Sequence, residues 1–301
     1  MRIKKIKKIE KSKTVYNLHI EKNNNYFAND LCVSNCHGTK ALSLQKILKK
    51  CTKSEFRLGF TGTLPTEPSD IYNIFGYLGP KIFSMKSKEL IDMGVLSPIK
   101  ICNLILKYPK DMVDYLKNRD YQTEIETTLG YEPRNKALDF IFEKIPDKQN
   151  TLLLVNRIEK HLDDVVPYLK KKFPNKKVYT IHGKVDTLER ERIRKLMEVE
   201  DNMIVVCTYQ TMGQGVNIKK IHNVIFFASY KSKIKILQSL GRGLRKHKTK
   251  KEVILWDVVD DLTWEKRTGN IGMNHTYKHY LQRLEYYKDQ KFKYINKNLE
   301  I

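Results

Sequence analysis

IVVCTYQTMGQGVNIKK, residues 204–220, joins an uninterrupted apolar run to a segment rich in Thr and Gly. Such a run is typical of a strand that is buried on both faces, as in parallel sheets covered by helices. The segment that follows then lies at the carboxyl edge of the sheet, where ligands bind. Gly215 would let the backbone approach a ligand closely, while Thr208, Thr211 and Asn217 offer hydrogen bonds to phosphate or sugar oxygens. The alternative is an ordinary flexible connection.

The same pattern extends along the chain on both sides of this stretch. Apolar runs alternate with amphipathic helices, and we expect strands at residues 151–155, 177–181, 203–207, 223–228 and 252–259. Alternation of this kind indicates a parallel sheet with helices on both faces, so we predict an α/β fold. A stretch that contains Gly, Ser and Pro, residues 94–100, is the expected boundary between this sheet and the preceding part of the chain.

A second motif, QSLGRGLRK at residues 238–246, carries two arginines three positions apart. Arg242 and Arg245 share one face of a helix at this spacing. Each glycine beside them costs about 1 kcal/mol relative to alanine inside a helix, which favours close packing against a ligand or domain over a solvated charge run. Guanidinium groups match the charge that develops on a transferred phosphoryl group.

Together these motifs resemble those of the C-terminal RecA-like domain of superfamily 2 helicases, and within them the UvsW type of phage recombination helicase. CTYQTMGQGVN is similar to motif V of that family, and QSLGRGLR is similar to motif VI. GFTGTLP, residues 59–65, is similar to motif III, and Cys36-His37 to the second half of the D-E-C-H motif II. The resemblance covers nearly all of residues 36–301.

The resemblance implies a RecA-like parallel-sheet helicase C-terminal domain at residues 98–301 with a helical tail, preceded at 36–97 by the end of a first RecA-like domain. It also implies an ATP-dependent DNA helicase or translocase that acts on branched recombination or replication-fork DNA. His37 would link hydrolysis to strand movement. The implied nucleotide-binding residues, of which the two arginines contact the γ-phosphate, are Gly215, Asn217, Gln238, Arg242 and Arg245. The residues implied to couple nucleotide state to nucleic acid are Thr61, Thr63, Thr208 and Thr211.

The parts of the family that hold ATP are missing from the chain. No GxxxxGK[ST] phosphate loop, which supplies the backbone cradle and lysine for ATP phosphates, occurs in the sequence. The Asp and Glu that should precede Cys36, to hold Mg²⁺ and activate water, are replaced by Ser34-Asn35. We therefore expect no ATP hydrolysis by this chain alone. ATP and Mg²⁺ would be held mainly by an N-terminal half on a second chain.

Residues 1–35 resemble the C-terminal fragment of a split intein, a small all-β element that ends in Asn and is followed by Cys. In trans-splicing the Cys36 thiol attacks a thioester, and a thiolate is a far stronger nucleophile than a hydroxyl. The Asn35 carboxamide then attacks its own carbonyl carbon, which forms a succinimide and cuts the chain before Cys36. The implied partner chain carries the intein N-fragment, the phosphate loop and a terminal Asp-Glu, so ligation would complete D-E-C-H.

This fragment departs from the intein family at three positions. Asn23-Asn24 stand where many inteins have Asp-His, and Ser34 stands where many have His. The missing histidines usually transfer protons during Asn cyclisation. His19 could substitute for them, with an ordinary surface-strand histidine as the alternative.

The chain is strongly basic, since Lys+Arg 57 against Asp+Glu 34 gives a formal net charge of +23. This excess favours DNA as a partner, with a lysine-rich solvated surface as the alternative. The 5 cysteines form no CxxC pair, so neither a disulfide framework nor a metal site is expected. No membrane span or signal peptide is indicated, and we expect a soluble protein of the cytoplasm, which is the host cytoplasm if a phage encodes it.

Two further patterns allow a structural and a functional interpretation. Tyrosines and leucines at helical spacing within residues 275–295 are expected to pack against the second domain rather than to stack on bases. Asp257, Asp260 and Asp261 are expected to form a solvated strand end rather than a metal site.

Three hypotheses follow. In the leading one, the chain is a precursor half that trans-splices into an ATP-dependent helicase. In the second, the intein halves hold two helicase fragments together without ligation. In the third, the chain is a stand-alone nucleic-acid-binding module, which predicts salt-sensitive DNA binding without a partner.

Overall fold

The computed structural model describes residues 25–28, 31–35, 42–50, 56–60, 64–65, 67–156, 158–209, 211, 218–229 and 246–301. The chain divides into two compact units, Met1–Phe83 and Ser84–Ile301. This division precedes the boundary predicted at residues 94–100, because helix α3 (Ser87–Asp92) belongs to the second unit. Lys86 Nζ donates to Asp289 Oδ1 at 3.1 Å, and Ser87 N donates to Gln290 Oε1 at 3.0 Å.

The first unit contains a three-stranded sheet of β1 (Asn25–Ala28), β2 (Leu31–Asn35) and β3 (Phe56–Phe60). β1 and β2 are antiparallel, whereas β2 and β3 are parallel, with Asn35 opposite Phe60. The helices of this unit are α1 (Leu42–Lys50) and α2 (Pro68–Leu78). The last strand of the predicted intein fragment therefore shares a sheet with a strand of the predicted helicase part. Residues 1–24, where the other early strands were expected, lie outside the described residues.

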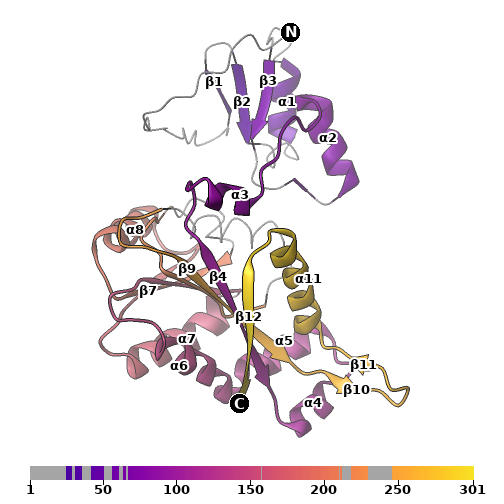
Figure 1. Ribbon diagram of the computed structural model, residues 1–301, viewed down its shortest axis with the longest axis vertical. Helices are drawn as coiled ribbons and strands as arrows, with labels where there is room; N and C mark the ends of the chain where they lie inside the picture. Colours follow the sequence, from indigo (N-terminus) through magenta and orange to yellow (C-terminus); the bar gives the residue numbers. More distant parts are fainter. Residues whose placement is uncertain are drawn as a thin grey trace. The chain divides into compact units, whose positions relative to one another are not determined.

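The second unit is built on a seven-stranded parallel sheet in the order β12-β4-β9-β8-β5-β7-β6 (Figure 1). This arrangement confirms the predicted α/β fold with a parallel sheet. The strands are β4 (Ile99–Lys107), β5 (Thr151–Val155), β6 (Lys177–Ile181), β7 (Met203–Thr208), β8 (Asn223–Phe226), β9 (Val253–Asp261) and β12 (Lys293–Glu300). A two-stranded hairpin of β10 (Trp264–Glu265) and β11 (Ile271–Gly272) follows β9.

Helices cover both faces of this sheet because its strands are apolar on both sides. Val205 of β7 belongs to one core and Val206 to the other. The first core includes residues of α8 (Thr187–Val199) and α11 (His275–Asp289), and the second includes residues of α4 (Lys110–Leu116), α6 (Lys136–Phe142) and α7 (Ile158–Lys172). Helix α5 (Tyr121–Gly130) and the 3-10 helix η2 (Glu132–Asn135) connect α4 to α6.

The tyrosine-rich tail forms α11 and packs on the sheet, as predicted. Tyr280 is 2% exposed beside Ile105 and Val259, and Tyr287 is fully buried. These two rings lie in the cores of the second unit and are inaccessible to bases.

Strand β9 carries three buried carboxylates, and each has a cation as partner. Asp257 is bonded to Arg283 of α11 through Nε–Oδ2 and Nη2–Oδ1 contacts, both of 2.8 Å, and Tyr287 donates to the same carboxylate at 2.9 Å. Burial acts to lower the pKa of Arg283, but the charge and hydrogen bonds of Asp257, together with Tyr287 and Tyr209, outweigh burial and raise this pKa. The Asp257 side chain is fully buried and that of Arg283 only 3% exposed, so this is a buried ion pair.

A second pair joins Asp260 to Arg134 of η2. Arg134 Nε donates to Oδ1 at 2.7 Å, Nη2 donates to Oδ2 at 3.1 Å, and the guanidinium lies 4.4 Å over the Phe227 ring. Tyr108 donates to Asp260 at 2.7 Å. Burial, followed by the charge of Asp260, raises the pKa of Tyr108 well above its ordinary value.

The expectation of a solvated end for β9 is therefore wrong. Asp257, Asp260 and Asp261 are 0%, 2% and 6% exposed, and Asp261 is paired with Lys107 of β4. Each carboxylate lies in the interior because a cation from another element meets it there, and an unpaired buried charge would be far more costly.

At the opposite, amino edge of the sheet, Asn150 and His222 form buried hydrogen bonds that link neighbouring segments. Asn150 is fully buried, and its side chain bonds the carbonyls of Met197 and Glu200 and the amide of Met203. His222 Nδ1 accepts from Asn150 N at 3.0 Å, which requires the neutral ring. Burial, followed by the charge of Lys250, lowers the pKa of His222 from 6.5 to about 4.

We predict that His222 makes the second unit sensitive to mild acid. Because the folded-state pKa lies below the unfolded value, the unfolded chain binds the proton first, and stability falls as pH drops from about 6.5 toward about 4. Between about pH 7 and about pH 5 the loss should be about 2 kcal/mol. Urea unfolding followed by circular dichroism measures it, and His222→Asn should remove this part of the pH dependence. An equal slope in both proteins would refute the assignment.

We predict that Arg283→Met destabilises the second unit by about 3–5 kcal/mol, because it leaves Asp257 buried without its cation. The double variant R283M/D257L should recover much of the loss in urea unfolding. Arg192→Ala is the matched control, since Arg192 binds Glu189 with two contacts of 2.7 Å but with 55% and 42% of the two side chains exposed. That change should cost less than about 1 kcal/mol. Similar losses in R283M and R192A would contradict the account.

Candidate functional site

Three neighbouring strands end together at the carboxyl edge of the seven-stranded sheet. Val155 of β5 lies opposite Thr208 of β7, and Leu154 lies opposite Phe226 of β8. Polar residues stand at or just beyond these strand ends, namely Asn156, Thr208 and Ser229. The edge therefore brings hydrogen-bonding groups from separate parts of the sequence together, as expected where parallel strands present a site.

Thr208 and Thr211 are brought together at this edge. Their hydroxyl oxygens lie 2.8 Å apart, and Thr211 N donates to Thr208 Oγ1 at 3.3 Å. The two residues are 5% and 3% exposed. The two hydroxyls therefore hydrogen-bond to each other, and together with the Thr211 amide they hold Thr208 and Thr211 together just before residues 212–217.

Asn156 links the ends of β5 and β8. Its Nδ2 donates to the carbonyl of Ser229 at 2.5 Å, while its buried Oδ1 has no hydrogen-bond partner among the described residues. Tyr209 adds a second link from β7, since its hydroxyl donates to the Ala228 carbonyl at 3.0 Å. The backbone at 228–229 is thus held from two sides, directly before the segment 230–245.

Helix α11 reaches the same point through its buried arginine. Arg283 bonds Asp257 with Nε and Nη2, and its Nη1 lies 3.4 Å from Ser229 Oγ. Ser229, the last described residue before the segment that carries QSLGRGLR, is therefore in contact with the β9–α11 ion pair. The expected arginines of this motif, Arg242 and Arg245, lie outside the described residues.

Most of the predicted site residues lie outside the described residues. Of those predicted for splicing, Asn35 ends β2 and Cys36 is not described. Of those predicted for nucleotide and nucleic acid, Thr208 and Thr211 are described and in contact. The predicted residues outside the described part are His37, Thr61, Thr63, Gly215, Asn217, Gln238, Arg242 and Arg245.

Sequence reasoning missed three residues of this edge. Asn156 and Ser229 each follow a buried apolar run, the same signal that pointed to Thr208, and could have been found by it. Arg283 carries no such signal, because its partner Asp257 is 26 positions away in a different kind of element.

Within the described residues, no group of three His, Cys, Asp or Glu side chains is placed to hold a metal ion. In the same part of the chain, no helix has the length and apolar character that crossing a bilayer requires. What the described edge offers is hydroxyl, amide and carbonyl groups, which suit contacts to a nucleotide or a nucleic-acid backbone.

The chain is similar to known helicases. Residues 134–247 match the helicase conserved C-terminal domain. The chain is 28% identical over 271 residues to the ATP-dependent DNA helicase uvsW of Enterobacteria phage T4, a match that covers 88% of this chain and 54% of that protein. The chain thus spans about half the length of this relative.

Solved structures agree with this match. The crystal structure of T4 UvsW superposes with a TM-score of 0.57 at 28% identity, covering 89% of this chain and 52% of that one. A fragment of a putative HsdR subunit of a type I restriction enzyme from Vibrio vulnificus YJ016 gives a TM-score of 0.61 at 19% identity, over 90% of this chain and 48% of that one, and shows the shared fold alone. The matches support a superfamily 2 helicase similar to the T4 protein, with a helicase C-terminal domain in residues 134–247.

Proposed function

We propose that residues 36–301 form the C-terminal half of an ATP-dependent superfamily 2 helicase or translocase that acts on DNA. The observation that carries the proposal is the helicase C-terminal domain match at 134–247, which spans both the β7 edge and the QSLGRGLR motif. These 301 residues contain no phosphate loop, so the groups that hold ATP and Mg²⁺ come from outside them. From the motif resemblance to recombination helicases, branched recombination or replication-fork DNA is the proposed substrate.

In this proposal the second unit contributes the residues that sense nucleotide. Arg242 and Arg245 contact the γ-phosphate, while Gly215, Asn217 and Gln238 line the cleft. The contacts of Ser229 and of the Thr208–Thr211 pair support this assignment, because they anchor the two segments that carry these residues. Closure of two domains around ATP would then move the bound strand.

The first unit contributes two of the proposed coupling residues, Thr61 and Thr63, and His37. β2 and β3 are parallel and end in register, with Asn35 opposite Phe60, just before Cys36 and Thr61. Carboxyl ends of parallel strands meet at one edge, which supports a common site for His37, Thr61 and Thr63.

We further propose that the chain is made as a precursor and joined to its partner by trans-splicing. Asn35 cyclises and releases residues 1–35, and Cys36 becomes the junction residue, so that the partner's Asp-Glu precedes Cys36-His37. The alternative is assembly of two unspliced halves through the intein fragment. The parallel pairing of β2 with β3 favours that alternative, since the fragment's last strand then remains in the sheet. A stand-alone nucleic-acid-binding module is the third possibility.

Either route takes place in the cytoplasm of a host cell in this proposal. The relatives that the chain matches include a phage helicase, and a reducing compartment would keep the Cys36 thiol free.

We predict that ATP hydrolysis appears only when the chain is combined with a partner that supplies the phosphate loop. Steady-state phosphate release should be stimulated by DNA, and Arg242→Ala should lower kcat about a thousandfold, because it removes charge from the transferred phosphoryl group. Lys248→Ala is the matched control, since Lys248 is an exposed cation near the same motif. Hydrolysis by the isolated chain, or full activity of R242A, would contradict the proposal.

We predict that coexpression with the partner yields one ligated protein that lacks residues 1–35, detected by intact mass spectrometry. Asn35→Ala should block cleavage before Cys36, because no carboxamide is then present to attack the carbonyl. If N35A retains DNA-stimulated ATP hydrolysis with both chains uncut, assembly without ligation replaces the splicing proposal. If both wild-type precursors persist without a ligated product, the splicing proposal is likewise contradicted.

A further inference from the structure

A short hairpin follows the carboxyl end of β9. Trp264 of β10 lies opposite Gly272 of β11, and Glu265 lies opposite Ile271. Lys266 N donates to the Asn270 carbonyl at 2.8 Å, and Gly269 N donates to the Lys266 carbonyl at 2.9 Å. Gly269 has φ +77°, which other residues rarely adopt, so the tip is a defined turn. The exposed tip presents Arg267 to solvent.

The indole of Trp264 lies directly on the backbone of Gly272. A Cβ atom at residue 272 would come within 2.2 Å of the ring, so only glycine permits this packing. One face of the indole is therefore covered by the opposite strand. Trp264 also lines a pocket of about 340 Å³ beside the hairpin, to which the side chain remains partly accessible.

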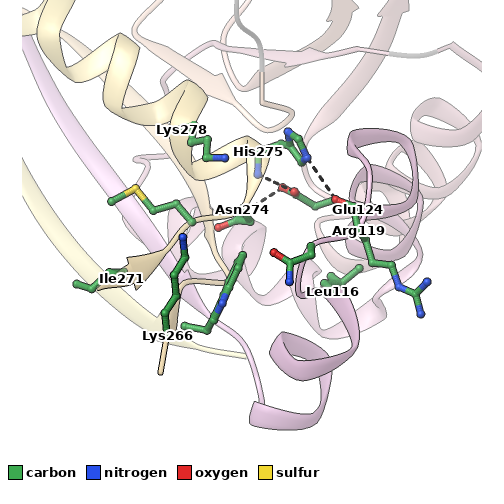
Figure 2. Close-up of a pocket in the computed structure, with 11 residues that line it drawn as sticks. Leu116, Arg119, Glu124, Lys266, Ile271, Asn274, His275 and Lys278 are labelled. Atoms are coloured by element: carbon green, nitrogen blue, oxygen red, sulfur yellow. Dashed lines mark hydrogen bonds between the residues drawn. The ribbon is translucent and has the colours of Figure 1, made fainter. Parts of the chain in front are cut away.

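Two lysines give this pocket its charge. Lys266 comes from the hairpin and Lys278 from the first turns of α11, and both line the pocket with exposed side chains (Figure 2). Neither makes an ion pair with any described residue. Arg119 also lines the pocket, but its guanidinium points away from it in Figure 2.

The one carboxylate that lines the pocket is fully engaged by its neighbours. Glu124 is 2% exposed and accepts from the amides of His275 and Thr276 at 2.7 and 2.8 Å, from Thr276 Oγ1 at 2.6 Å and from Asn274 Nδ2 at 2.9 Å. Four neutral donors satisfy its oxygens and hold the carboxylate away from solvent. The exposed residues of the lining are Asn118, Arg119, Lys266, Lys278 and Ile271, which is 63% exposed, and Trp264 is partly exposed beside them.

The pocket lies on the same edge of the sheet as the Thr208–Thr211 pair. The hairpin leaves the carboxyl end of β9, and β8 and β5 lie between β9 and β7 in the sheet. Three strand spacings of about 4.8 Å place β7 about 14 Å across the sheet from β9, and β9 extends about 10 Å beyond the level of Thr208, so the two strand ends lie about 17 Å apart. A single strand with about 3.4 Å per nucleotide covers that distance in about five nucleotides.

We propose that this pocket is a second contact site for a single-stranded nucleic acid, in which one base stacks on Trp264 and Lys266 and Lys278 bind the flanking phosphates. Aromatic rings beside cations are the features that bind single strands without regard to sequence. An acidic peptide would use the lysines but not the open ring. The choice of occupant rests on the proposed function, since a DNA translocase needs a path for one strand along this edge.

Intrinsic fluorescence of the full chain tests the proposal, because the protein has 2 tryptophans and Trp256 is only 5% exposed. Titration with a short oligothymidylate at low salt should quench Trp264, and Trp264→Phe should lose the signal but keep the affinity measured by fluorescence anisotropy of a labelled oligonucleotide. Trp264→Ala should bind about tenfold or more weakly.

The lysines are tested through salt dependence. K266A/K278A should lower the slope of log affinity against log salt by about 1.4, since each phosphate contact on a single strand contributes about 0.7. K170A/K171A is the matched control, because these exposed lysines end α7, which packs on β5, β6 and β7. That variant should keep the wild-type slope.

Three results would overturn the site. The first is that the chain does not bind oligothymidylate. The second is that it binds with no change in Trp264 emission and that K266A/K278A keeps the wild-type salt slope. The third is that a blunt duplex quenches Trp264 as strongly as the single strand does. None of these would refute the proposed helicase, which fails only if the joined protein lacks DNA-stimulated ATP hydrolysis.

Discussion

The arrangement of the second unit depends on three carboxylates on one strand. Asp257, Asp260 and Asp261 lie in the last part of β9, between β4 and β8, and bind cations from α11, η2 and β4. Each carboxylate enters the interior only with its cation, because an uncompensated buried charge costs several kcal/mol. β9 therefore fixes the positions of a helix, a helical turn and a neighbouring strand at once.

Such pairs define an arrangement more than they add stability. Apolar replacements of a whole buried ion pair are often neutral, whereas loss of one partner is severe. In this fold the Asp257–Arg283 pair sets the position of α11, and α11 supplies both Ser229's partner and Lys278 of the hairpin pocket. The two ends of the carboxyl edge, the β7–β8 end and the β9 hairpin, thus share one anchor.

Much of the sheet could be predicted from sequence, since β5, β7 and β8 are nearly continuous apolar runs and β6 and β9 are rich in apolar and β-branched residues. β12 gives no such signal, because it is an edge strand with mostly exposed side chains, and its Asn296 bonds Asn103 of β4. The prediction of a solvated end for β9 was wrong for a related reason. A charged residue in a sequence indicates solvent exposure unless the partner that would pair with it in the interior is known. Arg134 and Arg283 lie 126 and 26 positions from their aspartates.

The candidate site also contains some residues that could be predicted from sequence and others that could not. Thr208 and Thr211 followed from a local pattern, whereas the Trp264–Gly272 packing depends on strand register, which two-residue strands do not reveal in sequence. The motif resemblance located Arg242 and Arg245 without any geometry, and the fold shows how the chain is held at residues 228–229, before the segment that carries them.

The central claim is that this chain supplies the arginines that contact ATP held by another half. A crystal structure of the joined protein with a nonhydrolysable ATP analogue measures it most directly. The account predicts Arg242 and Arg245 with guanidinium nitrogens about 3 Å from γ-phosphate oxygens. A closed, nucleotide-bound structure in which both guanidiniums face away from the phosphate would contradict it.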